Sequence, residues 1–173
     1  HAAVLGHLLL LLERIKSEHD HDQQRRHPAD RAADTQEVEE VVDMLVSHEV
    51  GHALYTPTEE WYKEYKINPN VVNVVEDARI EKLMKRRYEG ITKTFYKGYT
   101  ELHSQDFFEV KKKDISKLSL ADRINLFFKI GSHYRISFTD QEQILVDRVA
   151  QCETFQDVLD PGPLRPLRGR ALL

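Results

Sequence analysis

Two histidines and a glutamate stand together in the run His48-Glu49-Val50-Gly51-His52, which is an H-E-x-x-H pattern. In a helix, residues four apart project from one face about one turn apart, so both imidazoles can bind a single Zn²⁺. The glutamate beside the first histidine is then placed to hold and deprotonate a metal-bound water. The pattern predicts His48 and His52 as metal ligands and Glu49 as the catalytic base.

A zinc site that hydrolyses a substrate needs a third protein ligand and an open fourth position for water. Glu76 and Asp77 follow in the next apolar-periodic stretch and are the candidates. At 100° per residue, Glu76 lies within about 40° of Val72, Ile80 and Leu83, which are residues of a packed flank. A carboxylate there is costly unless a positive group meets it, and a metal would do so. We therefore expect Glu76 to be the third ligand.

Asp77 lies on a wetter arc of the same helix, shared with Asn73, Glu81, Met84 and Tyr88. It suits an acceptor for the second ring N–H of a ligand histidine, and it is the alternative third ligand. A reading without metal is also open, in which Glu76 pairs with Arg79 or another basic side chain.

Helix signals dominate the chain, and strand signals are few. Asp34, with Glu37 three residues on, forms a capping-box pattern after a polar tract, residues 17–34, which reads as a loop. The apolar residues that follow repeat at helical spacing until Pro57: Val38, Val41, Val42, Leu45, Val46, Val50 and Leu54. We expect Val41, Leu45 and Leu54 to hold the apolar face of this helix.

A second helix is predicted to begin with Asn68 as its N-cap and Pro69 at the first helical position, and to run to about Tyr88. Further helices are predicted over residues 8–15, 92–107, 118–130, 140–150 and 154–159, with Ser119 and Thr139 as candidate caps. The fold class expected is mainly α with little or no sheet. The helices over residues 34–55 and 68–88 should pack against each other.

Composition narrows the classes of partner. The 173 residues suit a single domain, and a net charge of −4 favours neither nucleic acid nor an anionic membrane as a partner. The longest apolar run, Ala2 to Leu12, is too short for a membrane span and is broken by Gly6 and His7. The single cysteine, Cys152, fits a reducing compartment.

Three segments carry a resemblance to a known family. They are His48-Glu-Val-Gly-His-Ala-Leu-Tyr-Thr-Pro57, Asn73-Val-Val-Glu-Asp-Ala-Arg-Ile-Glu81 and Tyr88-Glu-Gly-Ile-Thr-Lys-Thr-Phe-Tyr-Lys-Gly-Tyr99. Together they resemble the predicted zinc metallopeptidases of tailed bacteriophages, which are similar to a segment of the cobaltochelatase subunit family. The resemblance covers residues 38–159, and its specific part runs from residue 48 to residue 108.

This resemblance implies a zincin-like, gluzincin-like peptidase module. Its site would be His48, His52 and the Glu76-Asp77 pair around Zn²⁺, with Glu49 as base. The family-like core would be residues 35–160 of one domain, 1–173, with atypical ends at residues 1–34 and 161–173. A peptide or protein would be the substrate, and a von Willebrand factor A-type domain would be a partner. The expected location is the cytoplasm of the host cell, or the virion.

Two questions stay open at the level of sequence. Tyr96, Tyr99 and His103 share one helical face, and one of them could donate a hydrogen bond to an oxyanion, although aromatic residues at this spacing are more often core. The second question is whether the chain is instead a non-catalytic helical module with a structural or vestigial metal site. The fourth coordination position separates these two functions, because a catalytic site keeps it for water.

Overall fold

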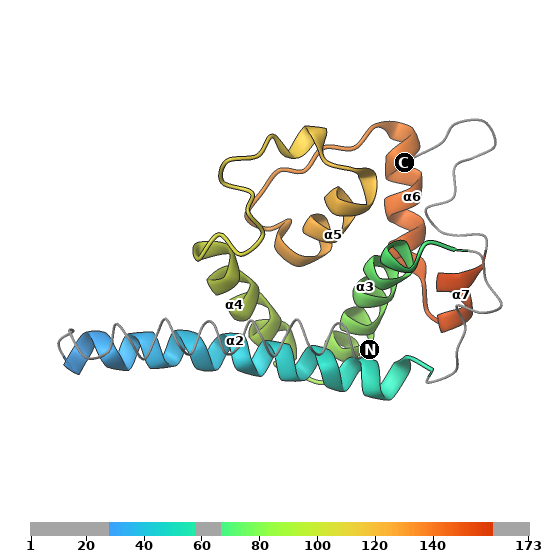
Figure 1. Ribbon diagram of the computed structural model, residues 1–173. Helices are drawn as coiled ribbons and strands as arrows, with labels where there is room; N and C mark the ends of the chain where they lie inside the picture. Colours follow the sequence, from blue (N-terminus) through green and yellow to red (C-terminus); the bar gives the residue numbers. More distant parts are fainter. Residues whose placement is uncertain (1–27, 58–66, 161–173) are drawn as a thin grey trace.

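The computed structural model describes residues 28–57 and 67–160, and within α2 it describes side chains from Gln36 onward. These residues form helices and connecting turns without a strand, so the predicted mainly α fold class is confirmed. The elements are α2 (Pro28–Tyr55), α3 (Pro69–Arg87), α4 (Ile91–Ser104), the 3-10 helix η2 (Ile115–Lys117), α5 (Leu120–Ile130), α6 (Asp140–Gln151) and α7 (Phe155–Leu159) (Figure 1).

Side chains before the helices fix where several of them begin. Asn68 accepts a hydrogen bond from the backbone N–H of Asn70, and proline follows at the first helical position. Ser119 accepts from the backbone N–H of Asp122 at the start of α5. Thr139 and Glu142 form a reciprocal capping box at the start of α6. The caps predicted at Asn68, Ser119 and Thr139 are confirmed.

The long helix α2 lies along one side of the molecule, and α3 and α4 rise from it (Figure 1). As predicted, α2 packs against α3, and it also packs against α4. Helix α3 contacts all of the other described α-helices, because it packs against α5, α6 and α7 as well as α2 and α4. Buried side chains form two clusters, one centred on α2 and α4 and the other on α6 and α7. Helices α3 and α5 contribute to both clusters, so α3 connects the two halves of the core.

The N-terminal end of α2 differs from the prediction. The helix begins at Pro28, and Asp34 lies inside it rather than at its cap, so the last part of the tract expected to be a loop is helical. Proline is itself favoured at the first helical position, where its missing N–H has no helical partner to lose. The rest of that tract, the helix predicted over residues 8–15 and the segment after Asp160 lie outside the described residues.

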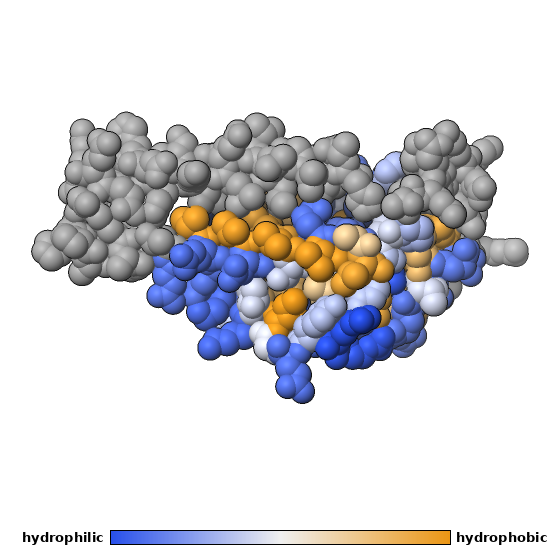
Figure 2. Space-filling view, turned by 90° about the horizontal axis from the view of Figure 1, so that it is seen from below, coloured by the Kyte–Doolittle hydropathy of each residue, from blue (hydrophilic) through white to orange (hydrophobic). Residues whose placement is uncertain are grey.

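The apolar face of α2 also differs from the prediction at its C-terminal half. Val41, Met44 and Leu45 are buried, whereas Val46, Val50 and Leu54 are 55%, 42% and 50% exposed. Figure 2 shows a stripe of apolar side chains on the face that α2 lines. The apolar residues that the sequence pattern grouped together lie on two different faces of this helix. Only the inner face packs on α3 and α4. Among the described helices, none has the length and apolar character needed to cross a membrane.

Candidate metal centre

Three side chains from α2 and α3 converge where these helices pack. His48 Nε2 and His52 Nε2 lie 3.2 Å apart. Asp77 Oδ1 lies 3.2 Å from His52 Nε2 and 3.6 Å from His48 Nε2. Histidines four residues apart on α2 thus face an aspartate on α3, and these three residues form a group that could hold a metal ion. His48 and His52 are 6% and 9% exposed, so the two imidazoles are largely removed from solvent.

The spacing of the three facing atoms fits a small divalent cation. Donor atoms arranged tetrahedrally at about 2.0–2.1 Å from a common centre are about 3.3 Å from one another. The observed separations of 3.2, 3.2 and 3.6 Å are close to this value. The site therefore needs little rearrangement to accept three-point coordination from these residues.

The tautomer of His48 follows from the carboxylate behind it. His48 Nδ1 lies 3.1 Å from Oε1 of Glu81, a buried residue of α3. Burial raises the pKa of Glu81, but the hydrogen bond from His48 and the charge of Lys85 outweigh it, so this pKa lies below its usual range. An ionised carboxylate only accepts hydrogen bonds, so His48 Nδ1 carries the proton. In the neutral imidazole, Nε2 then presents its lone pair to the cluster.

The tautomer of His52 follows from a chain of hydrogen bonds. Thr56 Oγ1 donates its only proton to Glu76 Oε1 over 2.5 Å. The same oxygen lies 3.0 Å from His52 Nδ1, so at this contact it acts as the acceptor. His52 Nδ1 therefore carries the proton, and Nε2 of the neutral ring is again the lone-pair atom. Two imidazole lone pairs and a carboxylate oxygen thus meet at one point, an arrangement that a cation or an added proton stabilises.

Lys129 of α5 fixes the orientation of the third residue. Its Nζ donates to Asp77 Oδ2 over 2.9 Å, which leaves Oδ1 facing the histidines. Burial raises the pKa of Asp77, but the charge of Lys129, with other positive contributions, outweighs it, and this pKa lies well below its usual range. Asp77 is therefore ionised and offers one oxygen to a cation.

Glu76, the expected third ligand, does not face the histidine pair. Its carboxylate is buried, but it faces Arg79, whose Nε and Nη2 donate to the two oxygens over 2.7 and 2.6 Å. Thr56 is a third donor to this carboxylate, so protein groups already occupy most of the acceptor positions of Glu76. The guanidinium of Arg79 is thus the positive group that offsets the cost of burying the Glu76 carboxylate. The structure brings Asp77, the alternative ligand, to the histidine pair instead.

Glu49, the expected base, follows His48 on α2 and lies about 100° around the helix from it. Its Oε1 is buried and has no hydrogen-bond partner in the described part of the chain. A buried polar atom left in this way typically costs about 1–3 kcal/mol, which is rarely tolerated without a function. A group held ready to accept a proton from water or substrate fits this observation.

The three candidates for an oxyanion donor separate in the structure. Tyr99 is buried, and its hydroxyl donates to Glu81 Oε1, the oxygen that also faces His48. Burial and the charge of Glu81 raise the pKa of Tyr99 well above its usual value, so it stays a donor. Tyr96 and His103 instead contact His133, with ring centroids 5.8 and 5.1 Å apart. Tyr99 therefore helps to hold Glu81, the partner of His48, whereas Tyr96 and His103 lie against His133 rather than among the three converging residues.

Sequence reasoning missed three residues that hold the site in place, Thr56, Glu81 and Lys129, and it named Tyr99 for a different role. Two of them carried a usable signal, because Thr56 stands four residues after His52 and Glu81 four residues after Asp77. Lys129 carried none, since it comes from α5 and only the packing of α5 on α3 brings it to Asp77.

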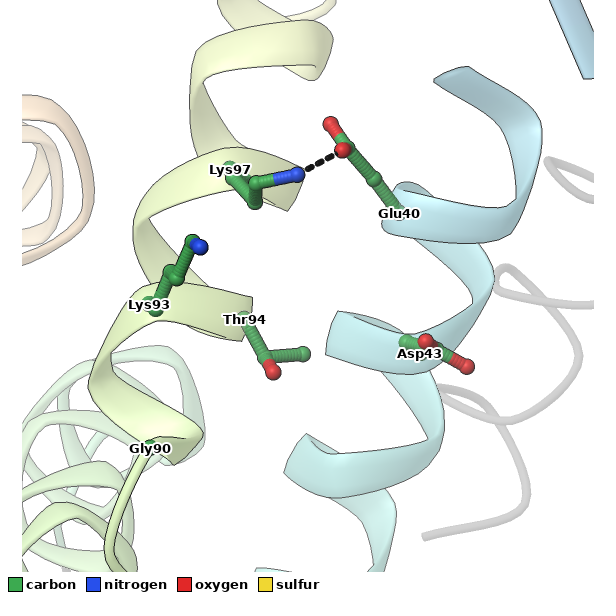
Figure 3. Close-up of a pocket in the computed structure, with 6 residues that line it drawn as sticks. All are labelled: Glu40, Asp43, Gly90, Lys93, Thr94 and Lys97. Carbon is green, nitrogen blue, oxygen red and sulfur yellow. Dashed lines mark hydrogen bonds and ion pairs between the residues drawn. The ribbon is translucent and has the colours of Figure 1, made fainter. Parts of the chain in front are cut away.

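A hollow of about 230 Å³ lies between α2 and α4 and is not part of this centre. Figure 3 shows Glu40 and Asp43 on one side and Lys93, Thr94 and Lys97 on the other, with Lys97 paired to Glu40. The two acidic and two basic side chains balance, so the hollow favours no single charge of ligand.

Comparison of the chain with protein-family models, with curated proteins and with solved structures finds no match.

Proposed function

We propose that this protein is a zinc-dependent metallopeptidase whose ligands are His48, His52 and Asp77. The observation that carries the proposal is the convergence of His48 Nε2, His52 Nε2 and Asp77 Oδ1, with both Nδ1 atoms engaged elsewhere. Two imidazoles and one carboxylate are a ligand set that catalytic zinc uses, with a fourth position left for water. The H-E-x-x-H pattern and the resemblance to phage metallopeptidases agree with this choice of metal and reaction.

Each residue has a role in peptide hydrolysis. Zinc, when bound, lowers the pKa of its water to about 7 and polarises the substrate carbonyl. Glu49 takes the proton of the attacking water and passes a proton to the leaving amine. Glu81 and Thr56 hold the two imidazoles by their Nδ1–H groups, and Lys129 keeps one oxygen of Asp77 turned to the histidines.

A second candidate is a non-catalytic helical module in which a metal ties α2 to α3. The burial of both imidazoles favours it, because structural metal sites are closed to solvent. Glu49 Oε1 has no hydrogen-bond partner among the described residues, and this favours the peptidase, since a purely structural site has no use for a base there.

The test pairs metal analysis with two variants of the H-E-x-x-H run. Glu49→Gln should keep one zinc per chain yet lose hydrolysis of quenched-fluorescence peptides by at least about 10²-fold, because the base acts on water rather than on the metal. His52→Ala should lose both zinc and activity. Turnover by Glu49→Gln at the wild-type rate would reject the peptidase assignment. Stoichiometric zinc without turnover of any peptide in a broad library would favour the structural module.

A further inference from the structure

Glu76 is buried beside the metal centre without being one of its converging ligands, and its contacts give it another role. Its Oε1 accepts from Thr56 Oγ1, and its two oxygens accept from Arg79. Thr56 Oγ1 in turn accepts from His52 Nδ1 at 3.0 Å. An uninterrupted chain of hydrogen bonds therefore runs from Arg79 through Glu76 and Thr56 to the ring of His52.

The far end of this chain is anchored to the backbone at two places. Arg79 Nη2 donates to the carbonyl of Tyr55, the last residue of α2, over 2.9 Å. Its Nη1 donates to the carbonyl of Glu153, between α6 and α7, over 3.1 Å. Arg79 is itself only 3% exposed, so its planar group is held on all sides. The position of Glu76 is thus set by three separate elements rather than by α3 alone.

We propose that Thr56, Glu76 and Arg79 form a positioning relay that selects the metal-binding atom of His52, an inference that rests on the proposed metal site. A threonine hydroxyl can donate or accept, so alone it does not choose a tautomer for the imidazole beside it. Glu76 accepts the hydrogen bond that the Thr56 hydroxyl donates, which leaves Thr56 Oγ1 to accept from His52 Nδ1–H. The relay therefore keeps His52 as the Nδ1–H tautomer, with Nε2 unprotonated and facing His48 and Asp77.

The sharpest test removes the hydroxyl and keeps the shape of the side chain. In Thr56→Val, His52 loses the acceptor for Nδ1–H, and we expect the dissociation constant for zinc to rise about 10- to 100-fold, the usual cost of losing such a partner. Thr56→Ser restores the hydroxyl and should stay within about threefold of wild type. Affinity is measured by competition with a chromophoric chelator, and circular dichroism verifies that each variant is folded.

A matched control makes the same exchange beside a histidine outside the site. Thr100 Oγ1 lies 3.1 Å from His133 Nε2 and donates to the carbonyl of Tyr96, so Thr100→Val removes a comparable hydroxyl from α4. We expect its zinc affinity to stay within about threefold of wild type. An equal loss in both valine variants would reject the relay, because the effect would then be a general one on packing.

A second readout is independent of zinc. Two-bond ¹H–¹⁵N spectra of the metal-free protein, at a pH alkaline enough to keep the imidazoles neutral, report which nitrogen of His52 carries the proton. Wild type and Thr56→Ser should show the Nδ1–H tautomer, and Thr56→Val a mixture. A pure Nδ1–H pattern in Thr56→Val would overturn the relay. If wild type shows this tautomer but binds no zinc, the proposed function fails while the relay stands.

Discussion

At the scale of single residues, the charges around the site are arranged in opposed pairs. Asp77 faces Lys129, and Glu81 faces Lys85 at 3.2 Å. The pKa of Lys129 is raised by Asp77 and Glu81, although burial works in the opposite direction, so its ammonium stays charged. Because each of these two carboxylates faces a lysine, α3 can bring both of them close to the imidazoles at a tolerable cost.

Cys152 allows a test of burial at the same scale, because it is the only cysteine of the chain. Its side chain is 3% exposed, and burial, with the charge of Asp157, raises the pKa of the thiol from 9.0 to about 11. We expect native protein near pH 8 to react with iodoacetamide far more slowly than urea-unfolded protein, since the thiolate is the reacting form. Labelling of native protein as fast as of unfolded protein would contradict this burial.

The raised pKa of Cys152 also makes the free energy of unfolding depend on pH. The folded state holds the thiol proton more tightly than the unfolded state does. The contribution of the protonated thiol to the free energy of unfolding is therefore complete below about pH 9 and is lost as the pH rises toward 11. In Cys152→Ala the decline in the free energy of unfolding over this interval should be smaller than in wild type, as measured by urea titrations across the pH range.

At the scale of elements, the contact between α2 and α4 depends on a glycine. A Cβ added at Gly98 would lie 2.3 Å from Met44 Cβ and 2.9 Å from the carbonyl oxygen of Glu40. Gly98→Ala should therefore destabilise the protein by about 1–3 kcal/mol, because separating the helices outweighs the roughly 1 kcal/mol gained in helix propensity. Urea unfolding measures the change.

Gly51 provides the matched comparison for this prediction. Its added Cβ would meet Ile80 Cδ1 at 2.9 Å and Met84 Cγ at 3.1 Å, which are side-chain atoms that can move aside. Gly51→Ala should therefore cost less than Gly98→Ala. The reverse order of the two variants would show that backbone approach does not limit the α2–α4 contact.

Helix α3 shows how far the sequence could predict the site. Its apolar spacing and the Asn68-Pro69 start were sufficient to predict the helix and its cap. The structure turns Asp77 rather than Glu76 toward the histidines, and the arc that looked polar, with Glu81 and Met84, is buried. Helix α3 contacts α2, α5, α6 and α7, so it has no single solvent-exposed face. Residue spacing along one helix also does not show which neighbouring helix covers each face.

Helix α2 also shows both what residue spacing can predict and what it cannot. The spacing of His48 and His52 was enough to place both imidazoles on one face, and the structure brings them together. Leu54 has the same apolar character as Leu45, yet one is 50% exposed and the other is 6% exposed. Nine residues at 100° each place Leu54 about 180° around α2 from Leu45. The face of α2 that carries Leu45 packs into the core with α3 and α4, and which of two apolar faces does so is a property of the tertiary arrangement.

At the scale of the whole molecule, the candidate metal centre lies where the two halves of the core are connected. Its histidines come from α2, which belongs to one hydrophobic cluster, and Asp77 from α3, which contributes to both. A bound cation would add a further link between α2 and α3, which are already joined by packing and by hydrogen bonds such as that from His48 to Glu81. Metal binding should therefore stabilise the entire fold rather than one helix end.

This coupling predicts a measurable thermal shift. At a free zinc concentration of about 100 times the dissociation constant, binding adds about 2.7 kcal/mol to the free energy of unfolding. For a chain of this length, that corresponds to a rise in Tm of roughly 5–10 °C near neutral pH. Protons compete with the cation for the imidazoles, so the rise should shrink as the pH is lowered toward about 5. Differential scanning calorimetry with zinc and with a chelator measures the shift.

Variants of the two helices decide whether the shift comes from the proposed centre. His48→Ala removes a donor from α2 and Asp77→Asn removes the charged donor from α3, so zinc should leave the Tm of each nearly unchanged. Asp157→Asn is the control, because this aspartate caps α7 through Thr154 and lies outside the centre. Its Tm should be lower without metal but should rise with zinc as in wild type. A zinc-dependent rise that persists in both His48→Ala and Asp77→Asn would place the metal elsewhere on the chain.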